Sequence, residues 1–389
     1  MDALKVIYPF VGDSVGGSHI STLTLIRTLD RRFFTPVIVL HQEGALAEFL
    51  QENGVKYEIL PLPAYAGATP RLSDILRSAA RAAATLRRFC HERDASLIHG
   101  NDLRINLTWG LSVWGTQYRF IWHQRSIPNS RSWLWKLVPK LADHVIFISS
   151  ATRERMLGKK ESPRHSIIMN PVSVNPLSPQ QKKHARECLR ESLGLEQDAW
   201  VFAFVARLVS LKKPETFIRV LARIQRESQH PVCGILAGHD QDGLRQELEN
   251  LAFRLGIGES VRFLGFRSPI DSCIAGSDLL IAPSYWDAFG RTLVEAMLLE
   301  TPVLASNAGG HREIIKEGKN GLFAEVDDVE EFCVKAIRIM MDKYTRENLA
   351  KTALLDAQQR FSAHSHAEAV SAIYRKVTGK KERREAWRE

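Results

Sequence analysis

Two carboxylates flank a glycine in residues 283–295, where a predicted strand ends and a predicted helix begins. Gly290 lets the chain enter the helix, whose first turn has free backbone N–H groups and a positive dipole end that suit a phosphate. Glu295 follows about one turn later, roughly 6–7 Å along the helix axis. There its carboxylate could accept hydrogen bonds from two neighbouring ribose hydroxyls. Asp287 lies in the loop before the glycine. A capped helix with a solvated glutamate would have the same pattern, so both interpretations stay open.

Basic residues and paired glycines follow two other predicted strands. Arg207 stands at the carboxyl end of one strand, and Lys212 stands at the start of the next helix. An Arg fork together with a Lys point charge could neutralise a leaving diphosphate, although two ordinary surface cations would look the same. Gly16 and Gly17 lie between the first strand and a helix, where they permit close backbone approach to a ligand or form a plain tight turn.

The loops that carry these residues must be positioned by sheets. In the first half of the chain, short β-branched runs alternate with segments whose apolar residues recur at spacings of three and four. This alternation predicts a parallel sheet with helices on both faces. Strands are predicted over residues 6–10, 36–40, 57–60, 97–99, 120–123, 145–149 and 167–169, and helices over 20–29, 72–93 and 133–141.

A proline-rich stretch at 170–179 interrupts this pattern and reads as a linker. The alternation then restarts, which predicts a second α/β domain facing the first across a cleft. Ligands of such sheets bind beyond the carboxyl ends of the strands. Strands are predicted over 201–205, 233–237, 261–264, 279–283 and 303–305, and helices over 214–226, 244–255, 291–299 and 329–341.

These motifs, in this order and at these separations, resemble the family 4 glycosyltransferases over residues 4–375. The stretch 279–323 is the most specific part of the resemblance when it is combined with Arg207 and Lys212. Further matching segments are 142–149, 168–172, 309–313 and 320–322. The resemblance implies the α/β GT-B fold, with two Rossmann-like domains facing across a cleft.

The domain boundaries expected from this resemblance place the acceptor domain before the donor domain. The first is an N-terminal Rossmann-like acceptor domain at 1–170, followed by a linker region at 171–198. The nucleotide-sugar donor domain would occupy 199–364. A helix at 365–378 would cross back to the first domain, and 379–389 would form a charged tail.

The implied reaction moves a hexose-type sugar from a nucleoside-diphosphate sugar to a hydroxyl of a glycan or lipid-linked acceptor, with retention of configuration. Cell-surface polysaccharide or glycolipid synthesis, including lipopolysaccharide, is the expected context. The resemblance implies no protein nucleophile, no cofactor and no metal. The leaving diphosphate would take the acceptor proton while neighbouring cations stabilise its charge.

Site roles follow from the resemblance by position. The family has two glutamates with seven residues between them, and this sequence has the shorter Asp287 in the first place and Glu295 in the second. The first acid would touch sugar hydroxyls and the second would hold the ribose. Arg207 and Lys212 would bind the diphosphate. The remaining expected donor-binding residues are Gly16, Gly17, Phe289, Gly290, Arg291 and Thr292.

Further candidate residues follow two predicted strands in the first half of the chain. His123 ends a predicted strand where the family often has a histidine near the reacting carbon, and it is expected to be catalytic. A buried, hydrogen-bonded histidine is the alternative. His99 and Asn101 follow the preceding strand, where relatives often have two histidines, and are candidate acceptor-binding residues. Arg125 could meet an acidic acceptor.

Charge is unevenly distributed along the chain. Of 53 Lys and Arg and 44 Asp and Glu, residues 1–170 hold 22 and 14, which is +8 of the net +9. This excess predicts an anionic partner for the first half, or simply a well-solvated surface. In the predicted helix 72–93, Arg77, Arg81 and Arg88 share one face, opposite a stripe at Leu72, Leu76, Ala79, Ala83 and Leu86. Such a helix could lie on an anionic membrane, although a core-facing stripe is the simpler interpretation.

Other features exclude several classes of protein. The five cysteines are odd in number and widely spaced, which argues against a disulfide framework, and neither a signal peptide nor a membrane span is recognised. The expected location is therefore cytoplasmic, with possible peripheral contact at the inner membrane face. The net positive charge suggests nucleic-acid binding, but no recognition motif supports it. A nucleotide-sugar epimerase or phosphorylase of the same fold, and a non-catalytic sugar-nucleotide binder, remain alternatives.

Two possible metal-binding patterns have simpler explanations. Asp240 and Asp242 formally match a metal-binding Asp-x-Asp motif, but they begin a predicted helix, where acids cap free N–H groups. His364 and His366 have no further ligands nearby in sequence and are expected at the exposed start of the last helix. The base, the sugar, the acceptor and the oligomeric state stay open at this stage.

Overall fold

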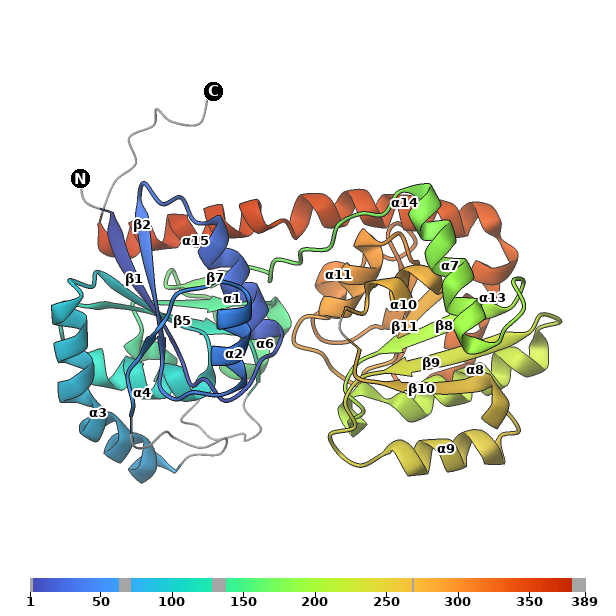
Figure 1. The fold of residues 1–389 in the computed structure, drawn as a ribbon, viewed down its shortest axis with the longest axis horizontal. Helices are drawn as coiled ribbons and strands as arrows, with labels where there is room; N and C mark the ends of the chain where they lie inside the picture. The colour runs from blue at the N-terminus through green and yellow to red at the C-terminus, as the bar shows by residue number, and fades with distance from the viewer. Residues whose placement is uncertain (1–2, 63–70, 128–137, 268, 380–389) are drawn as a thin grey trace, which may run out of the picture. The chain divides into compact units, whose positions relative to one another are not determined.

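The computed structural model describes residues 3–62, 71–127, 138–267 and 269–379. The chain folds into two compact units (Figure 1). The first unit comprises the chain up to Pro171 together with the segment from Ala363 onward, and the second comprises Val172–Ser362. The predicted charged tail lies outside the described residues except for Gly379, as does most of the predicted helix 133–141.

The first unit alternates strands and helices as expected. Its strands are β1 (Leu4–Phe10), β2 (Phe34–Leu40), β3 (Glu58–Ile59), β4 (Leu97–Gly100), β5 (Arg119–Gln124), β6 (His144–Phe147) and β7 (His165–Ile167). Its helices are α1 (Gly17–Thr28), α2 (Ala45–Glu52), α3 (Leu72–Glu92), α4 (Leu103–Val113), the short 3-10 helix η1 (Val138–Leu141), α6 (Ser150–Leu157) and the C-terminal α15 (Ala363–Thr378).

The first sheet is parallel, with the strand order β3-β2-β1-β4-β5-β6-β7. Successive residues of a strand face opposite sides of a sheet, so each buried strand contributes to two cores. In β1, Ile7 packs with residues of α3 and α4. Its neighbours Val6 and Tyr8 pack with α1, α2 and α15 on the other face. Helices therefore cover both faces, as the alternating sequence pattern predicts.

The second unit repeats this organisation. Its strands are β8 (Trp200–Val205), β9 (Val232–Ala237), β10 (Val261–Gly265), β11 (Leu279–Ala282), β12 (Val303–Ser306) and β13 (Leu322–Ala324). Its helices are α7 (Pro179–Leu193), η2 (Ser210–Lys212), α8 (Pro214–Glu227), α9 (Arg245–Arg254), η3 (Gly258–Ser260), α10 (Asp271–Gly276), α11 (Arg291–Leu298), α12 (His311–Ile314), α13 (Val329–Met341) and α14 (Lys343–Arg360).

The second sheet is also parallel, in the order β10-β9-β8-β11-β12-β13. Helices α8, α9 and α13 share a hydrophobic core with one of its faces. On the other side, α10 packs against α7 and α11 packs against α14. The two parallel-sheet α/β units confirm the predicted fold class. Strand β13 and helices α7, α10, α12 and α14 are elements of this unit that the sequence analysis did not recognise.

Part of the predicted linker at 171–198 is a helix of the second unit rather than a connection. Helix α7 begins with a capping box, in which the Ser178 hydroxyl accepts from Gln181 N–H at 3.2 Å while the Gln181 side chain accepts from Ser178 N–H at 2.9 Å. Pro179 occupies the first helical position, where its missing N–H costs nothing. Pro179, one of the three prolines that suggested a linker, therefore starts a helix.

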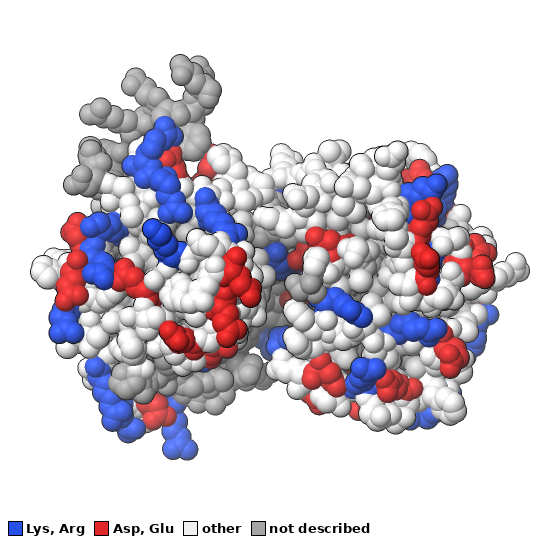
Figure 2. Space-filling view, viewed as in Figure 1, with Lys and Arg blue, Asp and Glu red and all other residues white. Residues whose placement is uncertain are grey.

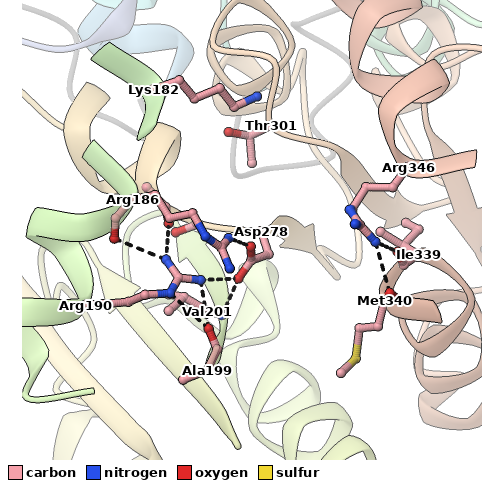
Figure 3. A network of polar contacts seen from close by, with 12 residues as sticks. Lys182, Arg186, Arg190, Ala199, Val201, Asp278, Thr301, Ile339, Met340 and Arg346 are labelled. Atoms are coloured by element: carbon pink, nitrogen blue, oxygen red, sulfur yellow. Dashed lines mark hydrogen bonds and ion pairs between the residues drawn. The ribbon is translucent and has the colours of Figure 1, made fainter. Parts of the chain in front are cut away.

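A buried ion pair anchors α7 to the second sheet (Figure 3). The Arg190 side chain is fully buried, and its Nη2 lies 2.6 Å from Asp278 Oδ2. Arg190 also donates to the carbonyl oxygens of Ala199 at 2.8 Å and Gly276 at 3.0 Å. Asp278 in turn accepts from Val201 N–H at 2.7 Å and pairs with Arg186. Every group of this network is satisfied, which is what a buried charge requires.

Replacing Arg190→Ala should destabilise the second unit by about 3 kcal/mol, because it leaves the Asp278 carboxylate buried with only Arg186 to balance it. The free energy of unfolding in urea measures this loss. Lys183→Ala on the same helix is the control, since Lys183 is mostly exposed and its pair with Glu187 spans 3.7 Å. That variant should change stability by less than about 0.5 kcal/mol. Equal effects of the two substitutions would contradict the anchoring role.

Candidate active site

The candidate site of the second unit lies where the order of strands in its sheet reverses. Strands β8 and β11 are neighbours, but β8 is followed by β9 on one side and β11 is followed by β12 on the other. In open parallel sheets ligands bind at such a switch point, outside the carboxyl ends of the strands. Lys212 follows β8 and Asp287 follows β11, so the topology brings two predicted site residues to one place.

Asp287 is the centre of a charged contact between three loops. Its Oδ2 forms an ion pair with Lys212 Nζ and lies 3.8 Å from His311 Nε2. Burial raises the pKa of the Asp287 carboxyl, but the opposing effects of Lys212 and His311 are larger in sum, and the net pKa is far below the ordinary value. The carboxylate therefore stays ionised at any physiological pH.

His311 is held in place by the end of β12. Its Nδ1 lies 3.1 Å from the Ser306 carbonyl oxygen, which can only accept, so Nδ1 carries the hydrogen when the ring is neutral. The hydroxyl of Ser306 donates to the Ser284 carbonyl at the end of the neighbouring strand. These bonds direct Nε2 toward Asp287, to which it can donate only when the ring carries a hydrogen on both nitrogens.

Two glycines let the loops after β11 and β12 approach each other. Gly310 N–H donates to the Asp287 carbonyl at 2.8 Å. A Cβ at Gly309, whose φ is +54°, would lie 2.8 Å from Asp287 N and closer still to its carbonyl oxygen. At Gly310 a Cβ would lie 2.7 Å from the Phe289 Cα. Real side chains do not tolerate such approaches, so the loop that positions Asp287 requires both glycines.

Helix α11 begins at this loop. Gly290 caps it with φ +102°, a conformation that L-residues rarely adopt. Phe289 is buried against Phe361, with ring centroids 5.8 Å apart, whereas Arg291 and Thr292 are half-buried in the first turn. The helix start places backbone N–H groups and the positive dipole end beside the Asp287 loop, as the sequence predicts.

Glu295 lies one turn inside α11 and is largely buried. Its Oε1 accepts from Arg291 Nε at 2.8 Å. Burial raises the pKa of Glu295, while Arg291 opposes that effect. A buried carboxylate with one arginine partner keeps lone pairs for further donors such as hydroxyl groups.

Arg207 stands at the carboxyl end of β8, as predicted, but it is exposed and its Nη1 donates to Gln241 rather than to an acid. The neighbouring Asp240 accepts from Leu244 N–H at 2.8 Å and Arg245 N–H at 3.1 Å. This confirms the capping interpretation of Asp240 over the metal-binding one. Among the described residues, no group of three or more His, Cys, Asp or Glu is arranged to hold a metal ion.

The first unit contains a chain of buried polar rings that joins β1, β4, β5 and α15. Tyr8 Oη lies 2.6 Å from Tyr374 Oη, which lies 2.5 Å from His99 Nδ1. His99 Nε2 lies 3.0 Å from His123 Nδ1. Burial lowers the pKa of both histidines well below the ordinary value, so both rings are neutral. His123 is therefore the buried, hydrogen-bonded histidine that the sequence left as an alternative.

The hydrogen bonds of this chain determine which nitrogen of His123 carries the proton. Each neutral imidazole has one N–H, so all members must donate in the same direction. If Tyr8 donates to Tyr374, and Tyr374 to His99, every hydroxyl hydrogen is used and His99 donates to His123 Nδ1. His123 then presents Nε2–H, a buried atom without a hydrogen-bond partner among the described residues. In the reverse direction, the buried Tyr8 hydroxyl would have no acceptor for its hydrogen.

The predicted exposure of His366 is wrong. The residue is not at an exposed helix start but is only 4% exposed, and its ring stacks on His123 with centroids 6.1 Å apart. Its Nδ1 donates to the Met169 carbonyl at 2.8 Å, which leaves Nε2 as an acceptor. Burial lowers its pKa to about 3. His364 of the same motif is exposed, as predicted.

The candidate acceptor residues of the first unit are buried in the same region. Arg125 Nε donates to Asn101 Oδ1 at 3.1 Å, and Arg125 Nη1 donates to Asn170 Oδ1. Asn101 also donates to the His99 carbonyl at 3.0 Å. Arg125, Asn101 and His99 are at most 7% exposed. The structure thus brings these three predicted residues together with His123 at the carboxyl ends of β4 and β5.

The glycines after β1 lie at the start of α1, where Gly16 N–H donates to His19 Nδ1 at 3.0 Å. The switch point of this sheet is between β1 and β4. There Asp13 and Arg104 form a bidentate ion pair, with N–O distances of 2.7 and 3.0 Å. The sequence analysis did not single out this pair. Gly17 is the first residue of α1.

Residues that sequence reasoning missed include His311, Tyr374 and Asn170. Two of them stand within the motif segments 309–313 and 168–172, so a role could have been assigned from the motif. Tyr374 lies in a helix 275 positions from its partner His99 and has no local signal.

The described residues contain no helix of sufficient length and hydrophobicity to cross a membrane.

Two family models match the chain. Residues 16–172 match the glycosyl transferase 4-like domain, and residues 185–356 match glycosyl transferases group 1. The D-inositol 3-phosphate glycosyltransferase of Corynebacterium kroppenstedtii is 31% identical over 263 residues, which cover 64% of this chain and 57% of that protein. The same enzyme of Kribbella flavida is 28% identical over 242 residues, covering 58% of this chain and 57% of the relative. The chain therefore spans little more than half the length of these curated relatives.

Solved structures share the whole architecture. Anabaena HepE, determined in complex with UDP and glucose, superposes with a TM-score of 0.79 at 22% identity and covers 95% of this chain and 99% of its own. WaaG, a glycosyltransferase of lipopolysaccharide biosynthesis, has a TM-score of 0.66 at 17% identity, covering 95% and 99%. These likenesses define the GT-B fold. The two family models, which together match most of the chain, show that it belongs to the family 4 glycosyltransferases.

Gly309→Ala should displace the loop that carries Asp287, because its Cβ would overlap that backbone. We expect a loss of stability at least 1 kcal/mol larger than for Gly318→Ala, measured by urea unfolding. Gly318 is a matched control, since its φ of +71° is equally unusual but nothing lies within 4 Å of its Cβ position. Equal losses would mean that backbone conformation alone, and not the loop contact, requires the glycine.

Proposed function

We propose that this protein transfers a hexose-type sugar from a nucleoside-diphosphate sugar to a hydroxyl of a glycan or lipid-linked acceptor, with retention of configuration. The observation that carries the proposal is the cluster of Lys212, Asp287 and the start of α11 at the switch point of the second sheet. A cation and a helix N-terminus suit a diphosphate, and Glu295 one turn further along suits a ribose.

In the proposed reaction the acceptor oxygen attacks the anomeric carbon as the bond from that carbon to the diphosphate oxygen breaks. The electron pair leaves with the diphosphate, which takes the acceptor proton. Lys212, Arg207 and the α11 N-terminus stabilise the charge that grows on the leaving oxygens. Asp287, which stays ionised, accepts hydrogen bonds from sugar hydroxyls. This scheme assigns the charge stabilisation to protein groups, so no metal or cofactor is proposed.

The first unit is proposed to bind the acceptor. Its buried His123 is neutral and presents Nε2–H, which suits a hydrogen bond to a hydroxyl rather than transfer of a charge. The name of the relatives, D-inositol 3-phosphate glycosyltransferase, gives a phosphorylated polyol as their acceptor. The excess positive charge of residues 1–170 favours an anionic acceptor for this protein as well. The UDP-bound HepE structures support a nucleotide-sugar donor.

Lys212→Ala should lower kcat at least 100-fold, because it removes a charge that stabilises the leaving group most in the transition state. Steady-state transfer assays with a panel of UDP-, GDP- and ADP-sugars provide the measurement. Lys213→Ala is the matched control, since the adjacent lysine pairs with Asp327 at 2.9 Å instead of Asp287. It should stay within threefold of the wild type. A kcat for Lys212→Ala within threefold would refute the assignment.

Glu295→Gln should weaken binding of the free nucleoside diphosphate by about 1–3 kcal/mol, the usual cost of losing a charged hydrogen bond. The pH dependence follows from burial, which raises the pKa of Glu295. The carboxylate is present above this raised pKa, so wild-type affinity should fall as pH drops through it, above the range of an ordinary glutamate. Calorimetry at several pH values tests both points. If the affinity of Glu295→Gln fell with decreasing pH in the same way as that of the wild type, another group would hold the ribose.

We also propose that the protein works at the inner face of an anionic membrane, through α3. Arg77, Arg81 and Arg88 are exposed on this helix. Leu72 and Leu76, predicted to face the core, are instead 43% and 52% exposed beside them. The helix buries Ala79 and Leu86 of the predicted stripe, but it also buries Ile75 and Ala82, so its core face is rotated from the predicted one. Figure 2 shows Lys and Arg side chains gathered where α3 lies in Figure 1.

Reversing Arg77, Arg81 and Arg88 to Glu should release the protein from vesicles that contain anionic lipid, since each charge near such a surface contributes about 1 kcal/mol. Donor binding should not change. The control reverses three exposed arginines of the second unit, Arg219, Arg245 and Arg254. Co-sedimentation across a salt series is the measurement. A wild type that stays in solution even at about 20 mM salt would exclude membrane contact through this helix.

A further inference from the structure

A cavity of about 410 Å³ lies in the first unit, at the edge of the sheet away from the histidine cluster formed by His99, His123 and His366. It is bordered by Val145 and His165, which stand at the amino ends of β6 and β7. His123 and Arg125 stand at the opposite, carboxyl edge. A strand of four to six residues separates the edges by roughly 13–20 Å. The cavity is therefore distinct from the candidate active site.

The cavity has an apolar floor and a basic rim. Ala142, Val145 and Leu157 line it from β6, the residues before it and the end of α6. Its basic lining residues are Lys140, Lys160 and Arg164, all exposed to solvent. Among the described residues, no carboxylate lies within ion-pair distance of these three side chains. Their charges are therefore available to an anion.

The acid and the histidine of the lining do not cancel this charge. Glu161 Oε1 is 3.1 Å from Arg153 Nη1, so that carboxylate already has its own cation. Burial, and then the charges of Arg153 and Arg164, lower the pKa of His165. Its Nδ1 is buried and has no hydrogen-bond partner within the described part of the chain. A neutral imidazole can present an N–H there to an incoming oxygen.

The simpler explanation is that these cations offset the dipole at the C-terminal end of α6. That end carries only about half a negative charge. The segment from Arg153 to Arg164 holds five Lys and Arg against two Asp and Glu, a net +3 within twelve residues. The excess is several times what the dipole requires, and two of its cations, Lys160 and Arg164, border the cavity together with Lys140 from outside the segment.

We propose that this cavity is a second ligand site, which binds a phosphomonoester through Lys140, Lys160 and Arg164. A phosphomonoester carries about −1.5 to −2 charges at pH 7, which matches the net charge of the lining. The apolar floor takes the carbon part of the same ligand. The cavity lies within the about 300–1,000 Å³ range of small-molecule sites. The phosphate could belong to a free metabolite or to a lipid headgroup.

Calorimetric titration of the full chain with glycerol 3-phosphate tests the site. The double variant Lys160→Glu with Arg164→Glu should bind at least tenfold more weakly than the wild type. Lys159→Glu is the control for Lys160→Glu, because it makes the same charge change as that single substitution one residue away but does not line the cavity. It should stay within twofold. Lys212→Ala should also keep this binding, so failure of the proposed donor site and failure of this site are distinguishable.

Vesicles of phosphatidylcholine with 20% phosphatidic acid, in about 100 mM salt, form the second arm. Binding of glycerol 3-phosphate that the double variant loses identifies a free phosphomonoester as the ligand. Sedimentation with these vesicles that the double variant loses, without binding of glycerol 3-phosphate, identifies the lipid headgroup. Absence of both in the wild type, or equal losses in Lys159→Glu and the double variant, would overturn the proposal.

Discussion

The second unit depends on keeping one largely buried carboxylate ionised. Removing Asp287 from water costs free energy, and the structure offsets that cost with Lys212 and His311 from two other loops. This balance works only if the loops after β8, β11 and β12 meet, and neighbouring strands place them only about 4.8 Å apart. Gly309 and Gly310 then remove the side chains that would keep the loops apart. The order of the strands, the positions of the glycines and the pairing of the charges therefore depend on one another. This arrangement also leaves the adjoining α11 N-terminus ready for an anion.

The first unit solves the burial of polar groups in a different way. Its central rings are neutral, because in a low-dielectric interior protonating His99 or His123 would cost more than hydrogen bonds return. Neutral hydrogen bonds connect these groups instead of ion pairs. The Tyr8 hydroxyl fixes their direction, and Tyr374 of α15 passes it on to His99 and His123. The C-terminal helix thus contributes to the chemistry of this unit as well as to its packing. In the sugar transfer proposed above, the two units would have separate tasks, with charge stabilisation in the second and hydroxyl recognition in the first.

The first unit has two distinct basic surfaces. They are the exposed face of α3 and the rim of the cavity at the amino edge of β6 and β7. The two differ in chemistry. On α3 the arginines flank exposed leucines on a convex helix, which suits an extended anionic surface. At Lys160 and Arg164 the cations surround a concave site, which suits a single phosphate. Neither surface lies among the buried residues of the histidine cluster.

The sequence by itself determined the two parallel-sheet units, most strand positions, and the placing of Asp287, Gly290 and Glu295 around the start of α11. These depend on local periodicity and turn chemistry, which a single chain segment carries. Only the tertiary structure decided that His366 is buried and that part of the proline-rich linker is a capped helix locked by Arg190. It also decided which partner each candidate meets. Such contacts join residues up to several hundred positions apart, and burial, hydrogen-bond satisfaction and pairing of charges are properties of the packed molecule, for which no local pattern exists.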